Sequence, residues 1–262
     1  MTIQSTLDLV CLVVANGFST GPVQLDEDQR LRVRARAMSS QAMDFYTGLP
    51  LEIDRSNGPY KFTIERLRPG LLYDDAEQMC VPSALFFNRL FGPKSLEQRA
   101  RYVQDLRRHA DWNFGPQRLL SMTDATQDAE ELTQGDVDHW RPIFLNQRKN
   151  QVKCRWDFHD LLTFVKDMGK RCAVTGVKTT NLSVDRIYNT NKYQRGDVVL
   201  MDLPLNWAKT SCPCFNSPVA FNAAFPGLTT RLRYLQGILA YLLNSDEQEW
   251  VRKMRRIEKS RV

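Results

Sequence analysis

The stretch that decides the fold lies between Arg171 and Lys209 and consists of four short motifs: RCAVTG (171–176), LSVDRI (182–187), GDVVL (196–200) and NWAK (206–209). The second and third motifs are short apolar runs bounded by polar and glycine-containing segments, which is typical of β-strands. The last motif continues as a short helix. Residues 172–209 are therefore predicted to form a β-hairpin followed by one helix, within an α+β fold that has further helices on either side.

These motifs resemble the pattern of phage-type HNH endonucleases, C-x-x-T-G, S-x-D-R-I, G-[ND]-V and N-x-x-K. The resemblance begins near Trp156. The spacing from Asp197 to Asn206 and from Asp197 to Lys209 equals the spacing of the corresponding residues in the family. It implies a ββα-metal module in which Asp185 and Asn206 hold Mg²⁺ or Mn²⁺ against a scissile phosphate. It also implies that Lys209 lies near phosphate and that the protein is phage-encoded.

The chain departs from the family pattern at three places. Arg186 follows Asp185 where the general-base histidine usually stands, and a guanidinium that stays protonated cannot take a proton from water. Asp197 replaces the middle asparagine of the motif. Zinc-binding relatives carry four cysteines, of which only Cys172 is present; the other places hold Thr175, Asp202 and Leu205. No zinc is therefore expected. Two interpretations stay open: a variant catalytic site in which Arg186 clamps the phosphate, or a module that has lost its activity.

A second, more eroded copy is predicted in the N-terminal half. The motifs FYTG (45–48), FTIER (62–66) and NRLF (88–91) follow the same order. The pattern predicts an internal duplication that places Arg66 over Arg186 and Asn88 over Asn206. It also allows a cluster of Glu65, Asn88 and Arg66. The alternative is coincidence, because Thr-Gly and Glu-Arg are common dipeptides.

The charge balance permits a nucleic-acid partner without requiring one. Lys and Arg number 36 against 30 Asp and Glu, a net charge of +6 in 262 residues. A helix over 246–259 with Ser245 as its N-cap carries the densest cationic run. Trp207, beside Asn206, is expected in the core, and stacking on a base is the alternative. The predicted phosphate contacts are Arg195, Lys209, Arg252, Lys253, Arg255 and Arg256. A second basic surface is expected on a helix over 94–111, from Arg99, Arg101, Arg107 and Arg108. The alternative for both is a solvated helix face.

Three segments are predicted: an eroded HNH-like repeat with flanking helices over 1–111, a linker over 112–150, and the HNH-like module with basic C-terminal helices over 151–262. The apolar run Leu7–Ala15 is too short to span a bilayer, so no membrane partner is expected. The six cysteines are sparse and irregular, which indicates an intracellular protein, in the host cytoplasm if phage-encoded.

Three functions compete at this point. The first is a metal-dependent endonuclease acting on DNA, with RNA as a further possible substrate. The second is a nucleic-acid-binding protein that keeps the scaffold without catalysis. The third is a subunit of a viral assembly or transcription machine, which uses the scaffold to bind a protein partner or another copy of itself.

Overall fold

The structure is a computed structural model, and it describes residues 43–52, 58–67, 80–110, 131–149, 154–179, 181–186, 192–195, 197–212 and 228–259. The apolar run Leu7–Ala15 lies outside these ranges. No described helix is long and apolar enough to cross a membrane.

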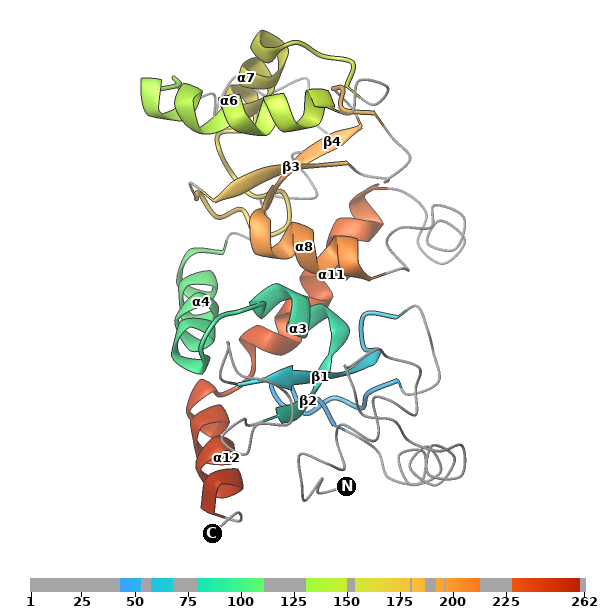
Figure 1. Cartoon of the computed structure of the whole chain (residues 1–262), viewed down its shortest axis with the longest axis vertical. Helices are drawn as coiled ribbons and strands as arrows, with labels where there is room; N and C mark the ends of the chain where they lie inside the picture. Colours follow the sequence, from blue (N-terminus) through green and yellow to red (C-terminus); the bar gives the residue numbers. More distant parts are fainter. Residues whose placement is uncertain are drawn as a thin grey trace. The chain divides into compact units, whose positions relative to one another are not determined.

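The described residues form a mixed α and β fold of helices and two small antiparallel sheets (Figure 1). In chain order the elements are β1 (Phe62–Arg66), β2 (Cys80–Ala84), α3 (Leu85–Phe91), α4 (Leu96–His109), α6 (Gln134–Lys149), α7 (Phe158–Asp167), β3 (Leu182–Arg186), β4 (Val198–Asp202), α8 (Leu203–Ser211), α11 (Leu228–Leu243) and α12 (Glu247–Lys259). The sheets pair β1 with β2 and β3 with β4.

Two compact units divide the chain. Unit 1 comprises residues 1–105, 211–213 and 241–262, and unit 2 comprises residues 106–210 and 214–240. The predicted segment boundaries, after residue 111 and after residue 150, both lie within the continuous range 106–210 of unit 2. Residues 241–262 belong with unit 1, and α6 forms inside the range predicted as a linker, with Trp140 and Phe144 buried.

Unit 2 contains the predicted hairpin and helix. Strands β3 and β4 pair from Leu182 opposite Asp202 to Arg186 opposite Val198, and α8 begins at the next residue, Leu203. Every residue of β4 is buried, because a run of β-branched and long apolar side chains packs well on a covered pleated surface. The predicted strand–strand–helix order over 172–209 is confirmed.

Helix α7 precedes the hairpin, as its sequence predicts. Asp157 and Asp160 form a reciprocal capping box at its start, which satisfies backbone donors that a helix leaves unpaired. Gly169 follows its end at a φ of +57°, a conformation that glycine adopts without steric cost. The helical spacing of Phe158, Leu161, Leu162 and Val165 predicts a helix over 157–168, and this prediction is confirmed. The buried residues of the helix are Leu161, Phe164 and Val165.

Unit 1 repeats the order β-strand, β-strand, helix with β1, β2 and α3. Helix α12 adds Trp250 to this unit: the indole is buried, its ring centroid lies 4.9 Å from that of Tyr46, and its Nε1 donates to the Tyr46 carbonyl at 2.9 Å. Burial of so large a side chain explains why the C-terminal helix belongs to unit 1 and not to the module beside it in sequence. At the start of α12 the Asp246 carboxylate accepts from the Gln248 amide at 2.9 Å, whereas the predicted cap, Ser245, donates back to Leu242.

Candidate functional site

The centre of the candidate site in unit 2 is a buried ion pair between Asp185 and Lys209. The Lys209 ammonium donates to Asp185 Oδ2 and, at 3.0 Å, to the backbone carbonyl of Arg186. The side chains are only 5% and 1% exposed. Asp185 was predicted to hold a metal ion and Lys209 to contact phosphate; in the structure each is bound to the other.

Asn206 lies on the same interface between strand and helix but has different partners. Its Nδ2 donates to Ser183 Oγ at 3.0 Å, and its Oδ1 accepts from Thr210 Oγ1 at 3.1 Å. Ser183 and Asp185 share one face of β3 because strand side chains alternate. Asn206 and Lys209 share one face of α8 because residues three apart in a helix are neighbours. The residues expected to make one metal site thus form two separate contacts along one interface.

The arrangement does not fit a divalent cation in the conformation shown. Mg²⁺ and Mn²⁺ need oxygen ligands free to coordinate them, yet one Asp185 oxygen already binds an ammonium group and both polar atoms of Asn206 are engaged. A dication placed at this carboxylate would also be repelled by the ammonium at short range. No cluster of three His, Cys, Asp or Glu side chains occurs within the described residues.

The two arginines predicted for this site have other contacts. Arg186 lies over the Tyr193 ring, with its guanidinium carbon 5.2 Å from the centroid. Arg195 forms an exposed ion pair with Asp167, of the kind that contributes little to stability. Trp207, which was expected in the core, is 53% exposed. The structure thus places an aromatic side chain on the surface of α8 beside Asn206.

Two side-chain hydrogen bonds of unit 2 recur at equivalent positions in unit 1. Asn88, the fourth residue of α3, donates to Thr63 Oγ1 at 3.1 Å, as Asn206 of α8 does to Ser183. The Thr63 hydroxyl donates across its sheet to the Ser83 carbonyl at 2.8 Å, and the Ser183 hydroxyl donates to the Met201 carbonyl at 3.0 Å. In both units the second residue of the first strand bonds its register partner, so the helix is tied to the sheet in the same way.

The turn before each hairpin also matches. Gly48 and Gly176 have φ values of +70° and +69°, and each donates to the carbonyl four residues earlier, Asp44 or Cys172, at 2.9 and 2.8 Å. The predicted alignment had one residue fewer in the first copy; the structure shows turns of equal length, with Asp44 in the place of Cys172.

Asp44 and Cys172 also have corresponding side-chain partners. Asp44 accepts from the Thr47 hydroxyl and the Ala84 amide, and Cys172 interacts with Thr175 and the backbone of Asp202. Burial raises the pKa of the Cys172 thiol and of the Asp44 carboxyl.

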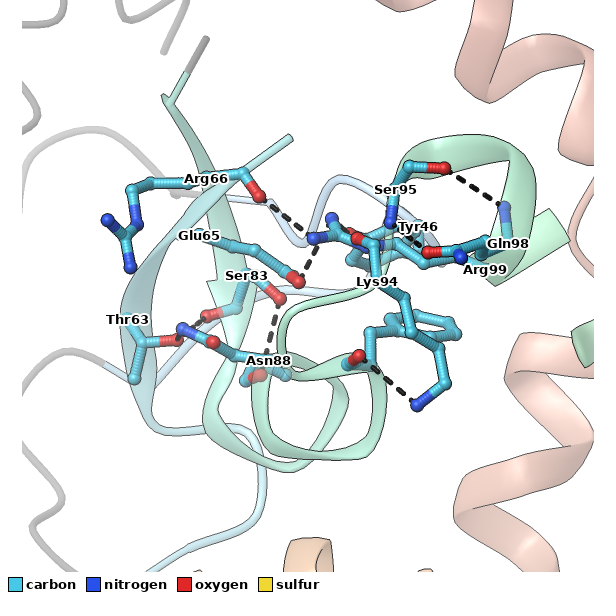
Figure 2. A network of polar contacts seen from close by, with 12 residues as sticks. Tyr46, Thr63, Glu65, Arg66, Ser83, Asn88, Lys94, Ser95, Gln98 and Arg99 are labelled. Carbon is cyan, nitrogen blue, oxygen red and sulfur yellow. Dashed lines mark hydrogen bonds and ion pairs between the residues drawn. The ribbon is translucent and has the colours of Figure 1, made fainter. Parts of the chain in front are cut away.

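The acidic residue of β1 is paired as Asp185 is, but with a cation from another element. Figure 2 shows the Arg99 guanidinium reaching Glu65, Tyr46 and the Arg66 carbonyl. Its Nη1 lies 3.0 Å from Glu65 Oε1 and 2.5 Å from the Tyr46 hydroxyl, and its Nη2 donates to the Arg66 carbonyl at 2.8 Å. Arg99 comes from α4, because α3 has Phe91 where α8 has Lys209. The predicted cluster of Glu65, Asn88 and Arg66 does not form: the guanidinium is that of Arg99, and Asn88 bonds Thr63.

Burial dominates the electrostatics of this cluster. It raises the pKa of Glu65 from 4.5 to about 7, opposed by the positive charge of Arg99 and by the hydroxyls of Tyr46 and Ser83. Among the described residues neither Glu65 oxygen has a hydrogen bond of ordinary distance and angle, so Arg99 and the two nearby hydroxyls act on the carboxylate mainly through their charge and dipoles. Burial also raises the pKa of Tyr46, and the Glu65 carboxylate raises it further.

The predicted basic helix forms, and its cations divide between two faces. Lys253 faces inward and donates to the Phe45 carbonyl at 3.0 Å. The outer face carries an exposed stripe that we call the α12 stripe: Arg252, Arg255, Arg256 and Lys259. Arg252 pairs with Asp246 and Glu249, and Arg256 lies 3.5 Å from Glu249. The N-terminal part of the stripe is thus partly neutralised by Glu249 of the same helix and by Asp246, which precedes it.

We expect Asn206→Ala and Asn88→Ala to lower the free energy of unfolding by similar amounts, about 1–2 kcal/mol each. Both remove the donor that ties the helix to the hydroxyl of the first strand. Thr210→Ala is the matched control, since it removes an exposed contact to Asn206 and should cost at most about 0.5 kcal/mol. Urea unfolding followed by circular dichroism measures all three. A large effect for one asparagine and none for the other would contradict the equivalence of the two contacts.

Sequence reasoning missed Arg99, which it placed on a basic surface. The sequence carries one hint, Phe91 at the position that corresponds to Lys209. The burial of Glu65, which makes a compensating cation necessary, is known only from the structure. No family model, curated protein or solved structure matches this chain.

Proposed function

We propose that this protein is a nucleic-acid-binding protein built from two HNH-derived ββα modules, and that it binds without hydrolysing phosphodiester bonds. The observation that carries the proposal is the buried pair of Asp185 and Lys209. The carboxylate on which metal-dependent cleavage would depend is bound to an ammonium group, and Arg186 stands where the family has its general base.

The duplication is supported by agreement in detail between the two units. Strand order, register, the asparagine-to-hydroxyl bond and the left-handed glycine of the preceding turn all correspond. Chance similarity between two short hairpins would not explain why hydrogen bonds recur between side chains at equivalent positions. The HNH derivation rests on the sequence motifs of residues 171–209 together with this ββα order.

Nucleic-acid binding is supported by the cationic and aromatic side chains that the two units expose. The α12 stripe in unit 1 presents cations at intervals of three and four residues, which lie along one helix face and can follow a phosphate backbone. In unit 2 the exposed Trp207 offers an aromatic face on which a base can stack. Cationic side chains supply affinity that does not depend on the nucleotide sequence. An exposed aromatic side chain favours nucleic acid with unpaired bases.

Fluorescence anisotropy with labelled duplex and single-stranded DNA should show binding that weakens steeply as KCl rises. Arg255→Ala with Arg256→Ala should reduce the slope of log K against log salt on duplex DNA by about 0.9 for each phosphate that is no longer neutralised. Trp207→Ala should weaken binding of the single strand by about 1–3 kcal/mol. Leu145→Ala is the control for Trp207, since Leu145 is a comparably exposed apolar residue, at 56%. Salt-insensitive binding, or none at low salt, would contradict the proposal and favour a protein-binding subunit of a viral machine.

The second candidate is the metal-dependent endonuclease. It is favoured by one observation, that Asp185 and Asn206 lie on the same strand–helix interface, and it requires Lys209 to leave the carboxylate. Plasmid nicking in Mg²⁺ and Mn²⁺ separates the two: the proposal expects no nicking by the wild type. Nicking that Asp185→Asn abolishes, with DNA binding unchanged, would establish the endonuclease instead.

A further inference from the structure

We infer that in each module a side-chain cation stands in the place of the divalent ion of the ββα-metal fold: the Lys209 ammonium in unit 2 and the Arg99 guanidinium in unit 1. This inference rests on the HNH derivation within the proposed function, but not on nucleic-acid binding. On this inference both buried cations have the same role: each neutralises the strand carboxylate that would otherwise face a metal ion.

The two cations bind the same pair of backbone positions. Lys209 contacts the carboxylate of the fourth residue of β3 and the carbonyl of the fifth, Asp185 and Arg186. Arg99 contacts the carboxylate of the fourth residue of β1 and the carbonyl of the fifth, Glu65 and Arg66. A buried carboxylate and a backbone carbonyl oxygen that point at one position are ligands of the kind that a hard cation takes.

The cations reach that position from different elements. Lys209 is the seventh residue of α8; the seventh residue of α3 is Phe91, and Arg99 comes instead from the following helix, α4. The Arg99 guanidinium carbon lies 5.8 Å from the centre of the Phe91 ring, so the aromatic that displaced lysine now packs against the replacement. Two separate sources of one positive charge indicate that the position requires the charge and not a particular residue.

Each cation is also buried beyond what a surface ion pair requires. Lys209 and Arg99 are each 1% exposed. Removing such groups from water is costly, so the carboxylate opposite must supply most of the compensation. A single ammonium or guanidinium neutralises one carboxylate, whereas a dication needs further anionic ligands. A single acid on the first strand of each hairpin is therefore enough to balance a side-chain cation, as expected if the cation has replaced the ion.

The test is whether removing the ammonium opens a metal position. The probe is MnCl₂ added to the full chain, and the variant is Lys209→His, which replaces the cation by an imidazole ligand beside Asp185 and Asn206. We expect MnCl₂ at a concentration of about 5 mM to leave the wild-type Tm unchanged. It should raise the Tm of Lys209→His by about 3 °C or more. Lys209→His combined with Asp185→Asn should abolish that shift. Lys259→His, on the α12 stripe, controls for manganese binding by any exposed imidazole.

If Lys209→His is unfolded without metal, its refolding is followed by circular dichroism with and without MnCl₂. Recovery with manganese that the Asp185→Asn double variant lacks would support the inference. No shift in a folded Lys209→His, or no recovery in an unfolded one, would overturn it. A wild-type Tm that rises with manganese in an Asp185-dependent way would also overturn it. None of these outcomes depends on whether the protein binds DNA, so failure of the two proposals can be told apart.

Discussion

Arg99→Met is expected to lower the free energy of unfolding by about 3–5 kcal/mol at pH 8. The substitution keeps much of the apolar volume but leaves the Glu65 carboxylate buried without its cation. It also leaves the Arg66 and Lys94 carbonyls and the Tyr46 hydroxyl without their donor. The decrease should be smaller at pH 6, since the pKa of Glu65 is raised to about 7 and the protonated acid needs no counter-charge.

Urea unfolding at the two pH values measures this effect. Arg101→Met is the matched control, because Arg101 is an exposed arginine on the same helix and its substitution should change stability by at most about 0.5 kcal/mol. A decrease below about 1 kcal/mol at pH 8 would show that Arg99 is no more than a surface cation. An equal decrease at both pH values would show that it does not act through Glu65.

Glu65→Gln is expected to remove a pH dependence of stability that the wild type shows between about pH 5 and pH 8. Burial raises the pKa of Glu65 from 4.5 to about 7 in the folded protein, so the folded state holds the proton more tightly than the unfolded state. The resulting stabilisation is fully present below the unfolded pKa and is lost as pH rises through the folded pKa. Its size is about 3 kcal/mol for a shift of this extent.

The measurement is the free energy of unfolding at pH 5, 6, 7 and 8 for the wild type and Glu65→Gln, compared as a difference. The buried Asp44 has a raised pKa and contributes a slope of the same sign, which cancels in that difference because both proteins contain it. Glu97→Gln, an exposed position on α4, should leave the wild-type slope intact. Parallel curves for wild type and Glu65→Gln would mean that Glu65 does not titrate in this range.

The secondary structure of the described residues was largely predictable from local sequence. The runs LSVDRI and GDVVL predicted β3 and β4, and the segment that contains NWAK predicted the helix that forms as α8. Such patterns are local: which residues turn inward in a strand or helix depends on its period and not on distant contacts. The strand–strand–helix order over 172–209 was visible for the same reason.

The pairing of the charged side chains was decided by tertiary structure. Sequence spacing could show that Asp185, Asn206 and Lys209 share a module, but not that Lys209 would take the carboxylate and Asn206 the Ser183 hydroxyl. Nor could it show that Trp207 would lie on the surface. Each outcome depends on how α8 is rotated against its hairpin, and that rotation is set by packing over the whole interface.

Arg99 illustrates the difference between what the sequence determines and what only the tertiary structure determines. The sequence by itself showed only that Phe91 stands at the position that corresponds to Lys209 in the predicted duplication. Only the tertiary structure determined that α4 supplies the missing charge, from a position 33 residues beyond the Arg66 carbonyl that it also binds. Sequence patterns place a charged residue on the surface because burial requires a group that compensates its charge. When that group is distant in sequence, the local pattern does not reveal it.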